Sequence, residues 1–102
     1  MIIEIDDFDW DTGNFSKNLK KHGILSGEIE EVFLNNSVFV FPDPGHSHEE
    51  TRFIGFGKTN SGKWLAIAFT MRAKAGRILL RPISGRPMHK KEKEIYEKEF
   101  SI

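Results

Sequence analysis

The stretch that decides the fold is "RFIGFGKTNSGKWLAIAFTMRAKAGRILLRPIS", residues 52–84. It contains three runs rich in β-branched and aromatic residues, which are separated by the turn sequences "TNSG" and "AKAG". In the middle run, four apolar residues alternate with a second set of side chains: Leu65, Ile67, Phe69 and Met71 against Trp64, Ala66, Ala68, Thr70 and Arg72. This period of two predicts a strand with one apolar face, and the three runs together predict an antiparallel sheet.

Two further segments outside this stretch have strand character. The run "SVFVF", residues 37–41, predicts a fourth strand that Pro42 closes, and the opening "MIIEI" is a weaker candidate for another. Pro82 cannot donate a backbone hydrogen bond. Its run is therefore predicted to lie at an edge of the sheet or to contain a bulge.

The segment before the sheet predicts two short helices. Asp11 is a candidate N-cap for a helix over residues 12–22, which Gly23 ends. Phe15 and Leu19 lie at helical spacing within it. Ser26 is a candidate cap for a second helix, whose apolar patch is Ile29, Val32 and Phe33 and whose end is the pair Asn35-Asn36.

A third helix is predicted at the C-terminus. It begins at Pro87, because proline suits the first helical position, and continues through "MHKKEKEIYEKEF". The predicted fold is therefore α+β, with an antiparallel sheet of three or four strands, two N-terminal helices and a C-terminal helix. At 102 residues with 38% hydrophobic content, we expect residues 1–102 to form a single domain.

Composition limits the possible chemistry and location. The chain has no cysteine, which excludes disulfides, thiolate nucleophiles and zinc–thiolate sites. It has neither an apolar run of about 20 residues nor a signal-peptide pattern, so we expect a cytoplasmic protein that does not enter a membrane. No GxGxxG or P-loop pattern occurs, so nucleotide-cofactor binding has no support, and we expect no cofactor.

The net charge of zero conceals a difference between the two halves of the chain. Residues 1–50 carry eleven acidic and three basic side chains, a net charge of −8, while residues 51–102 carry four acidic and twelve basic ones, a net charge of +8. If the halves form different surfaces, the C-terminal one attracts polyanions. Alternatively, folding interleaves the charges.

The segment "RPISGRP", residues 81–87, is a candidate anion site. Arg81, Ser84 and Arg86 are predicted to lie at the end of a strand and in the turn before a helix N-terminus, where amide groups and the helix dipole favour a phosphate. Lys90 and Lys91 add to the positive field. In the alternative interpretation, the arginines pair with carboxylates of the acidic half and the lysines form a solvated face.

For the other candidate residues, a structural role is favoured over a functional one. In the loop "PDPGHSHEE", residues 42–50, two histidines and two glutamates suggest a metal site, but no second ligand cluster exists and a polar loop is favoured: His46, His48, Glu49 and Glu50. His22 suits the end of the first helix, with a proton shuttle as its functional alternative. We expect core packing rather than base stacking for three aromatic residues, Phe8, Trp10 and Phe15.

A set of short motifs, taken in order, resembles a known family. They are "FDWD" (8–11), "NLKKHG" (18–23), "EEVF" (30–33), "FPDP" (41–44) followed by "HS", "RFIGFGKTNSGKWLAIAFTMR" (52–72) and "RPISGRPMHKKEKEIYE" (81–97). Their order and spacing resemble the BrnT family of type II toxins. The resemblance implies a RelE-like fold, a ribosome-independent ribonuclease that arrests growth, and a cognate BrnA-like antitoxin. It also implies that promoter DNA is bound only through the toxin–antitoxin complex.

The resemblance also assigns site residues. The family's basic C-terminal signature maps onto Arg81, Ser84, Arg86, Lys90, Glu92 and Tyr96, its first-helix signature onto Asn18, Lys20, Lys21 and His22, and its strand positions onto Arg52, Thr70 and Arg72. Three residues depart from the family pattern: Pro82, Gly85 and Pro87. Lys90 and Lys91 stand where arginine is frequent, which loses bidentate geometry toward phosphate.

The implied reaction is metal-independent attack of a ribose 2′-OH on the adjacent phosphorus, which leaves a 2′,3′-cyclic phosphate. Arg81 and Arg86 are the candidates for stabilising the phosphorane, and Glu92, His22 and Lys90 are candidates for proton transfer, in an open order. The remaining residues are predicted to contact RNA: Lys20, Lys21, Arg52, Arg72, Ser84, Lys91 and Tyr96. For Tyr96, packing or orienting its neighbours is the alternative.

Two other functions stay open from the sequence. The chain can be a catalytically weak module that binds its antitoxin and acts in transcriptional autoregulation, which the three departures favour slightly. It can also be a domain whose basic half binds nucleic acid nonspecifically. An acidic antitoxin would suit the basic half in either case.

Overall fold

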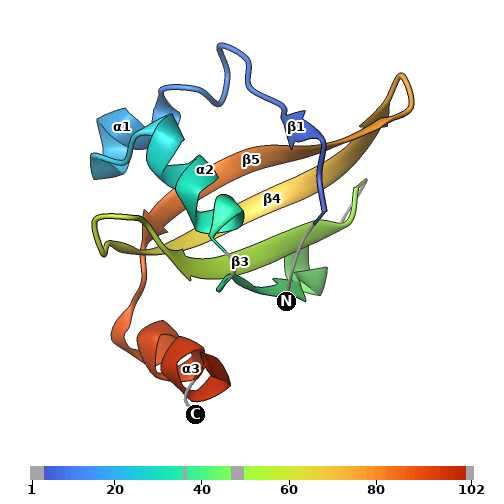
Figure 1. The fold of residues 1–102 in the computed structure, drawn as a ribbon. Helices are drawn as coiled ribbons and strands as arrows, with labels where there is room; N and C mark the ends of the chain where they lie inside the picture. The colour runs from blue at the N-terminus through green and yellow to red at the C-terminus, as the bar shows by residue number, and fades with distance from the viewer. Residues whose placement is uncertain (1–3, 36, 47–49, 101–102) are drawn as a thin grey trace.

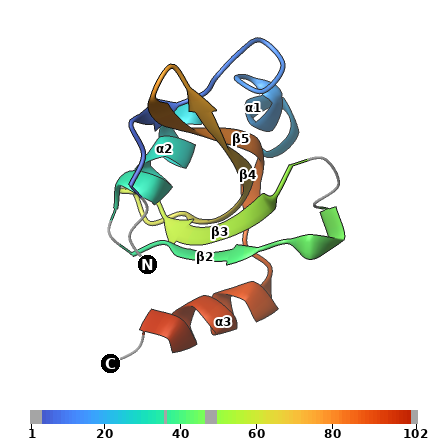
Figure 2. The same ribbon diagram turned by 90° about the vertical axis from the view of Figure 1, so that its right-hand side faces the viewer.

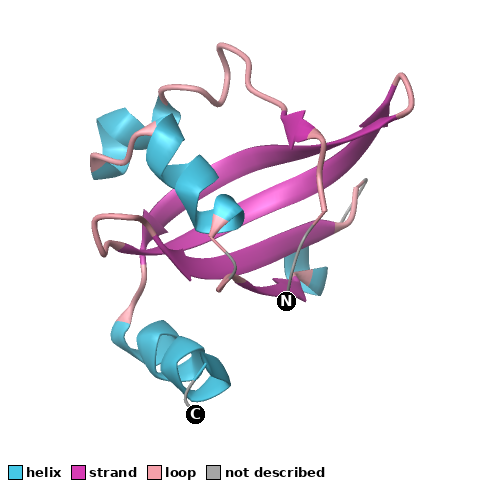
Figure 3. Cartoon of the chain, in the orientation of Figure 1, coloured by secondary structure: helices cyan, strands magenta, loops and turns pink. Residues whose placement is uncertain are grey.

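The computed structural model describes residues 4–35, 37–46 and 50–100, apart from the side chains of Asn18 and Leu19. The helices and strands follow in the order β1 (Asp7–Phe8), α1 (Lys17–His22), α2 (Ser26–Leu34), β2 (Phe39–Pro42), the 3₁₀ turn η1 (Pro44–His46), β3 (Arg52–Lys58), β4 (Trp64–Lys74), β5 (Arg77–Pro87) and α3 (Lys90–Phe100) (Figures 1 and 3). The predicted α+β class is confirmed.

The sheet has five strands in the order β1-β5-β4-β3-β2. Strands β2 to β5 pair antiparallel, as predicted, whereas β1 pairs parallel with β5. The prediction of three or four purely antiparallel strands is therefore wrong. The fifth strand is Asp7–Phe8 rather than "MIIEI", whose first three residues lie outside the described ones. Backbone bonds from Asp6 to Ile78 and from Asp9 to Leu80, both 2.8 Å long, hold it.

Strand β5 extends further than the sequence predicts. The sequence predicts that this strand ends at Ser84 and that a helix begins at Pro87, but β5 continues to Pro87 and α3 begins at Lys90. The predicted bulge is present: Pro82 pairs with Phe69 and Ser84 with Ala68, which leaves Ile83 as the extra residue. The bulge absorbs the proline without ending the strand.

The first helix is shorter than predicted, because it begins at Lys17. Asp11 does not cap it. Instead, Asp11 Oδ1 accepts hydrogen bonds from the backbone N–H groups of Gly13 (2.8 Å) and Asn14 (3.2 Å), which closes a turn. Phe15 is 55% exposed and touches Trp10 edge-on, so the prediction of core packing is wrong for Phe15.

The second helix has a different start from the predicted one. Leu25 is its N-cap, and the Leu25 N–H donates to the Glu28 side chain at 2.9 Å, so Ser26 is the first helical residue rather than the cap. Its predicted apolar patch, Ile29, Val32 and Phe33, is buried as expected.

The helices cover the two faces of the sheet unequally (Figure 2). On one face, α2 packs against the alternating residues Leu65, Ile67 and Phe69, and Phe8 and Trp10 pack against this core as predicted. On the other face, Met88 and Tyr96 of the C-terminal segment cover Phe56 and Ala66. We call this second face the outer face. Helix α3 covers the part of the outer face around Phe56 and Ala66. The part that carries Ala68, Thr70 and Arg72 lies beyond the helix.

The close approach of α2 to the sheet depends on Gly57. A Cβ atom at this position would lie 2.7 Å from Val32 Cγ1, which is shorter than a van der Waals contact. We predict that Gly57→Ala lowers the free energy of unfolding by about 1–3 kcal/mol because the core is overpacked. In urea denaturation, the double variant Gly57→Ala/Val32→Ala should be less destabilised than the sum of the single variants.

The matched control is Gly27→Ala in α2, where an added Cβ meets no atom within 4 Å. This substitution should stabilise the protein by up to about 1 kcal/mol, since alanine favours the helix. Additive effects of the Gly57 and Val32 substitutions would contradict the proposed close contact.

Candidate functional site

The outer face carries three cross-strand rows of side chains, and a groove lies beside the part of this face that α3 covers. The first row is Arg52, Thr70 and Arg81; the second is Ile54, Ala68 and Ser84; the third is Phe56, Ala66 and Arg86. Side chains at alternate strand positions share a face, and the bulge at Ile83 keeps Arg81, Ser84 and Arg86 in register with it. The small residues Ala66 and Ala68 leave space above the middle of the sheet.

Two adjoining pockets occupy this groove, and Arg52 lines both. The Arg86 pocket lies toward α3 and is lined by, among others, Asp43, His46, Arg52, Ala68, Ser84 and Arg86. The Thr70 pocket lies toward α1 and is lined by, among others, Asn14, Lys17, Arg52, Thr70, Arg72 and Arg81. The groove thus collects side chains from β3, β4 and β5 and from the two connections beside them.

Arg86 is held in the Arg86 pocket by a bidentate ion pair with Glu92. The two guanidinium–carboxylate distances are 2.7 and 2.8 Å, and Glu92 Oε1 also accepts the His89 backbone N–H at 2.7 Å. The Glu92 carboxylate therefore occupies the N-terminus of α3, where a phosphate was predicted to bind. Its hydrogen bonds with Arg86 and then with His89 lower the pKa of Glu92, so it is ionised at neutral pH and poorly suited to accept a proton.

An aspartate–histidine pair faces the same pocket. His46 Nδ1 lies 2.9 Å from Asp43 Oδ2, and both residues line the pocket with Arg86. When Nδ1–H donates to Asp43, the ring's Nε2 is the atom available for proton transfer. The sequence interpretation of residues 42–50 as a polar loop missed this pair, although the spacing of "DPGH" places both side chains on one short turn.

The described residues of the loop 42–50 do not support a metal site. His48 and Glu49 lie outside the described residues, His46 contacts Asp43, and Glu50 contacts Arg72. Among residues 4–35, 37–46 and 50–100, no three histidine, aspartate or glutamate side chains are grouped as a metal ion would require.

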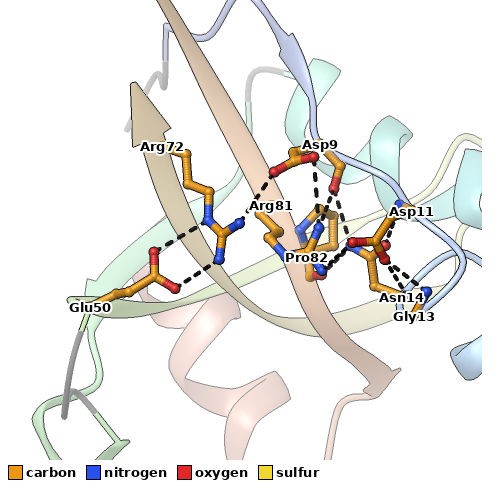
Figure 4. Close-up of polar contacts among 8 residues, drawn as sticks. All are labelled: Asp9, Asp11, Gly13, Asn14, Glu50, Arg72, Arg81 and Pro82. Carbon is orange, nitrogen blue, oxygen red and sulfur yellow. Dashed lines mark hydrogen bonds and ion pairs between the residues drawn. The ribbon is translucent and has the colours of Figure 1, made fainter. Parts of the chain in front are cut away.

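The arginines of the Thr70 pocket belong to a network with carboxylates (Figure 4). Arg72 binds Glu50 through two hydrogen bonds of 3.0 and 3.3 Å, and Arg81 binds Asp11 at 2.8 Å. Asp9 lies between the two guanidinium groups, 3.8 Å from Arg72 and 3.7 Å from Arg81. These contacts show that folding interleaves the two charged halves here. The alternative interpretation is thus correct for Arg81, whereas Arg86 pairs within its own half.

The remaining predicted site residues lie elsewhere. Tyr96 lies on the face of α3 that packs against the sheet, where it is buried, and its hydroxyl donates to the Ser37 carbonyl at 2.6 Å. His22 lines a different pocket, together with Trp64 and Lys93. Four lysines are exposed and line neither groove pocket: Lys20, Lys21, Lys90 and Lys91.

The fold and the site together define a small α+β protein with a cation-lined groove across one face of its sheet. A family model described as the ribonuclease toxin BrnT of a type II toxin–antitoxin system matches residues 10–92. The chain therefore belongs to the BrnT family of ribonuclease toxins, and this membership implies an antitoxin partner. A search of curated proteins returned no match. Within the described residues, no helix has the length and apolar character needed to cross a bilayer.

The Arg86–Glu92 pair predicts a pH-dependent stability. Because the pKa of Glu92 is lowered from its ordinary 4.5, its contribution is present above pH 4.5 and is lost as the pH falls through the lower, folded-state value. We predict that Glu92→Gln destabilises the protein by about 1 kcal/mol at pH 7, since both side chains are partly exposed. The difference should shrink at pH 3 in urea denaturation.

Glu97→Gln is the matched control, because Glu97 is exposed on the same helix. It should change stability little at either pH. An equal loss for Glu92→Gln at pH 7 and pH 3 would show that the carboxylate charge contributes nothing.

Proposed function

We propose that this protein is a ribosome-independent and metal-independent endoribonuclease that cleaves RNA in the Arg86 pocket. Cleavage yields a 2′,3′-cyclic phosphate and a 5′-OH end, arrests growth, and is neutralised by a cognate BrnA-like antitoxin. Residues 1–102 act as a single domain in this proposal. The observation that carries it is the shared pocket of a positioned guanidinium, Arg86, and an aspartate–histidine pair, Asp43 and His46.

Arg86 supplies the positive charge that the phosphorane requires. Its described hydrogen bonds to Glu92 and to the Pro87 carbonyl take three of the five guanidinium N–H groups, and the others are available to phosphate oxygens. Glu92 fixes the orientation of the guanidinium before the substrate arrives. Such preorganised charge is effective because no side chain has to reorient as negative charge develops.

His46 is proposed for one of the two proton transfers. With Asp43 holding Nδ1–H, the neutral ring can accept the proton of the attacking 2′-OH at Nε2, and the protonated ring can donate a proton to the leaving 5′-oxygen. This assignment replaces Glu92, whose lowered pKa suits the role of positioning Arg86. His22 and Lys90 stay as predictions from the resemblance, but neither lines the Arg86 pocket.

The departures from the family pattern are compatible with an active site. Pro82 lies at the bulge, and a Cβ at Gly85 would approach Ile29 and Ile67 on the opposite, apolar face. Neither residue therefore displaces Arg86 or Ser84 from the groove. Pro82 and Gly85 therefore give no support to the alternative of a module that binds its antitoxin without cleaving RNA.

The antitoxin is proposed to cover the groove. An acidic segment laid across Arg52 and Arg86 would occupy the positions of the RNA phosphates and exclude the substrate. In this proposal, promoter DNA is contacted through the antitoxin of the complex.

The first test is cleavage of purified, ribosome-free RNA in the presence of EDTA. We predict that the wild type cleaves it and leaves 2′,3′-cyclic phosphate ends, and that Arg86→Ala lowers kcat/KM about 100-fold or more. Arg86→Lys should remain impaired because lysine cannot form the bidentate pair with Glu92. Arg77→Ala, which removes an exposed arginine paired with Asp7 outside the groove, is the matched control and should keep its activity.

If RNA stays intact after incubation with the folded wild type, the protein is instead a module that binds its antitoxin without cleaving RNA. Loss of cleavage in EDTA alone would show that a metal ion takes part.

The role of His46 has its own test. We predict that His46→Gln lowers kcat about 100-fold with little change in KM, and removes one limb of the pH dependence of kcat/KM. Asp43→Asn should lower kcat less, since it leaves the imidazole in place but loses its orienting charge. Wild-type rates and an unchanged pH profile in His46→Gln would rule out this histidine as the proton-transfer group.

A further inference from the structure

We propose that the Thr70 pocket is a second phosphate subsite, which binds the phosphate of a nucleotide flanking the one that is cleaved. The proposal rests on the proposed ribonuclease function for the identity of the ligand as RNA. It concerns a pocket separate from the Arg86 pocket, in which no bond is broken. The ligand class is a phosphodiester within a single-stranded RNA chain.

The first observation is an unpartnered buried hydroxyl. Thr70 is 3% exposed and lines the pocket, and among the residues that the structure describes, Thr70 Oγ1 is the buried side-chain polar atom without a hydrogen-bond partner. Leaving a buried hydroxyl unsatisfied is unfavourable, so such a group is explained best by a ligand that satisfies it. A phosphate oxygen accepts a hydrogen bond from a hydroxyl group.

The second observation is the set of cations around this hydroxyl. Arg52 and Arg81 flank Thr70 in the same cross-strand row, Arg72 follows two residues along β4, and Lys17 enters from α1. Lys17 Nζ lies 3.5 Å from the Ile83 carbonyl, at the bulge. Four cationic side chains thus line one pocket, a composition that suits a phosphate rather than a neutral ligand.

Carboxylates share this region and restrict the geometry. Glu50 also lines the pocket and binds Arg72, while Asp9 and Asp11 bind the arginines from outside it. These contacts fix the guanidinium groups in place at the pocket wall without supplying a hydrogen-bond partner to Thr70 Oγ1. A bound phosphate would compete with Glu50 for Arg72, so binding should weaken steeply as salt is added.

The position of the pocket indicates the path of the RNA. The row of Thr70 and the row of Arg86 are four residues apart on β4, about 14 Å at 3.4 Å per residue. Arg52 lines both pockets, and the short side chain of Ala68 lies on the sheet between them. An RNA chain that occupies both pockets therefore runs along the strands, with the scissile phosphate at Arg86 and a flanking phosphate at Thr70.

The test uses substrates of graded length. One is a dinucleoside monophosphate, which has the scissile phosphate alone, and the others are RNA oligonucleotides lengthened by one nucleotide at a time on the 5′ or the 3′ side. For the wild type, we expect kcat/KM to rise about 10-fold at the length at which an added phosphate reaches the Thr70 pocket. Thr70→Val should abolish this rise, with the dinucleotide as the internal reference.

A stability measurement separates this role from a structural one. Valine has nearly the shape of threonine and removes the unsatisfied hydroxyl, so the melting temperature of Thr70→Val should be unchanged or higher. Thr59→Val is the matched control: Thr59 is buried in the β3–β4 turn outside the groove, and its hydroxyl accepts the Lys63 N–H. This control should melt at a lower temperature and keep the length-dependent rise.

Two results would overturn the proposal: Thr70→Val retains the length-dependent rise, or its melting temperature falls as that of Thr59→Val does. If the wild type cleaves no RNA, the proposed function fails and binding of a 2′-O-methyl RNA, followed by fluorescence anisotropy, tests the subsite alone. A roughly 10-fold weaker affinity for Thr70→Val would then support the subsite, and an equal affinity would overturn it.

Discussion

The ion pair between Arg86 and Glu92 joins the last residues of β5 to the first turn of α3, and the groove depends on this junction. Glu92 pairs with Arg86 and also accepts the N–H of His89 at the helix start, so one carboxylate fixes both the guanidinium and the beginning of the helix. From there, α3 runs over the aromatic end of the outer face. The other end, which carries Arg52, Arg72 and Arg81, stays uncovered.

The sequence predicts the central hairpins well, because the alternation in residues 52–84 requires nothing beyond the pleat of a strand. Prediction from the sequence fails for the segments whose structure depends on backbone pairing with another strand. Strand β1 has two residues and one acidic side chain among them, so no pattern marks it, and two backbone bonds beside it create the pairing with β5. Pro82, Ser84 and Gly85 are turn-forming residue types, yet the bulge allows them to continue the strand.

The candidate site could be predicted only in part, because its residue types are visible in the sequence but their tertiary arrangement is not. Its arginines are visible as residue types, but the row of Arg52, Thr70 and Arg81 exists through the register of two hairpins. His46 joins Arg86 because the 3₁₀ turn η1 brings it to the pocket that Arg86 lines, a tertiary arrangement that no local spacing specifies. Conversely, Glu92 is a candidate for proton transfer from the sequence, while its contacts hold the Arg86 guanidinium in place.

The charge pattern acquires a physical meaning once the contacts are known. The acidic N-terminal segment does not form a separate repelling surface; Asp9 and Asp11 bind Arg81, and Asp9 also approaches Arg72. Arginines held in this way lose little side-chain entropy when a phosphate binds, because that entropy has been lost on folding. The same contacts reduce the net attraction for a polyanion. A groove built on paired arginines should therefore favour a correctly placed phosphate over nonspecific binding, which distinguishes it from an exposed lysine surface such as that of α1 or α3.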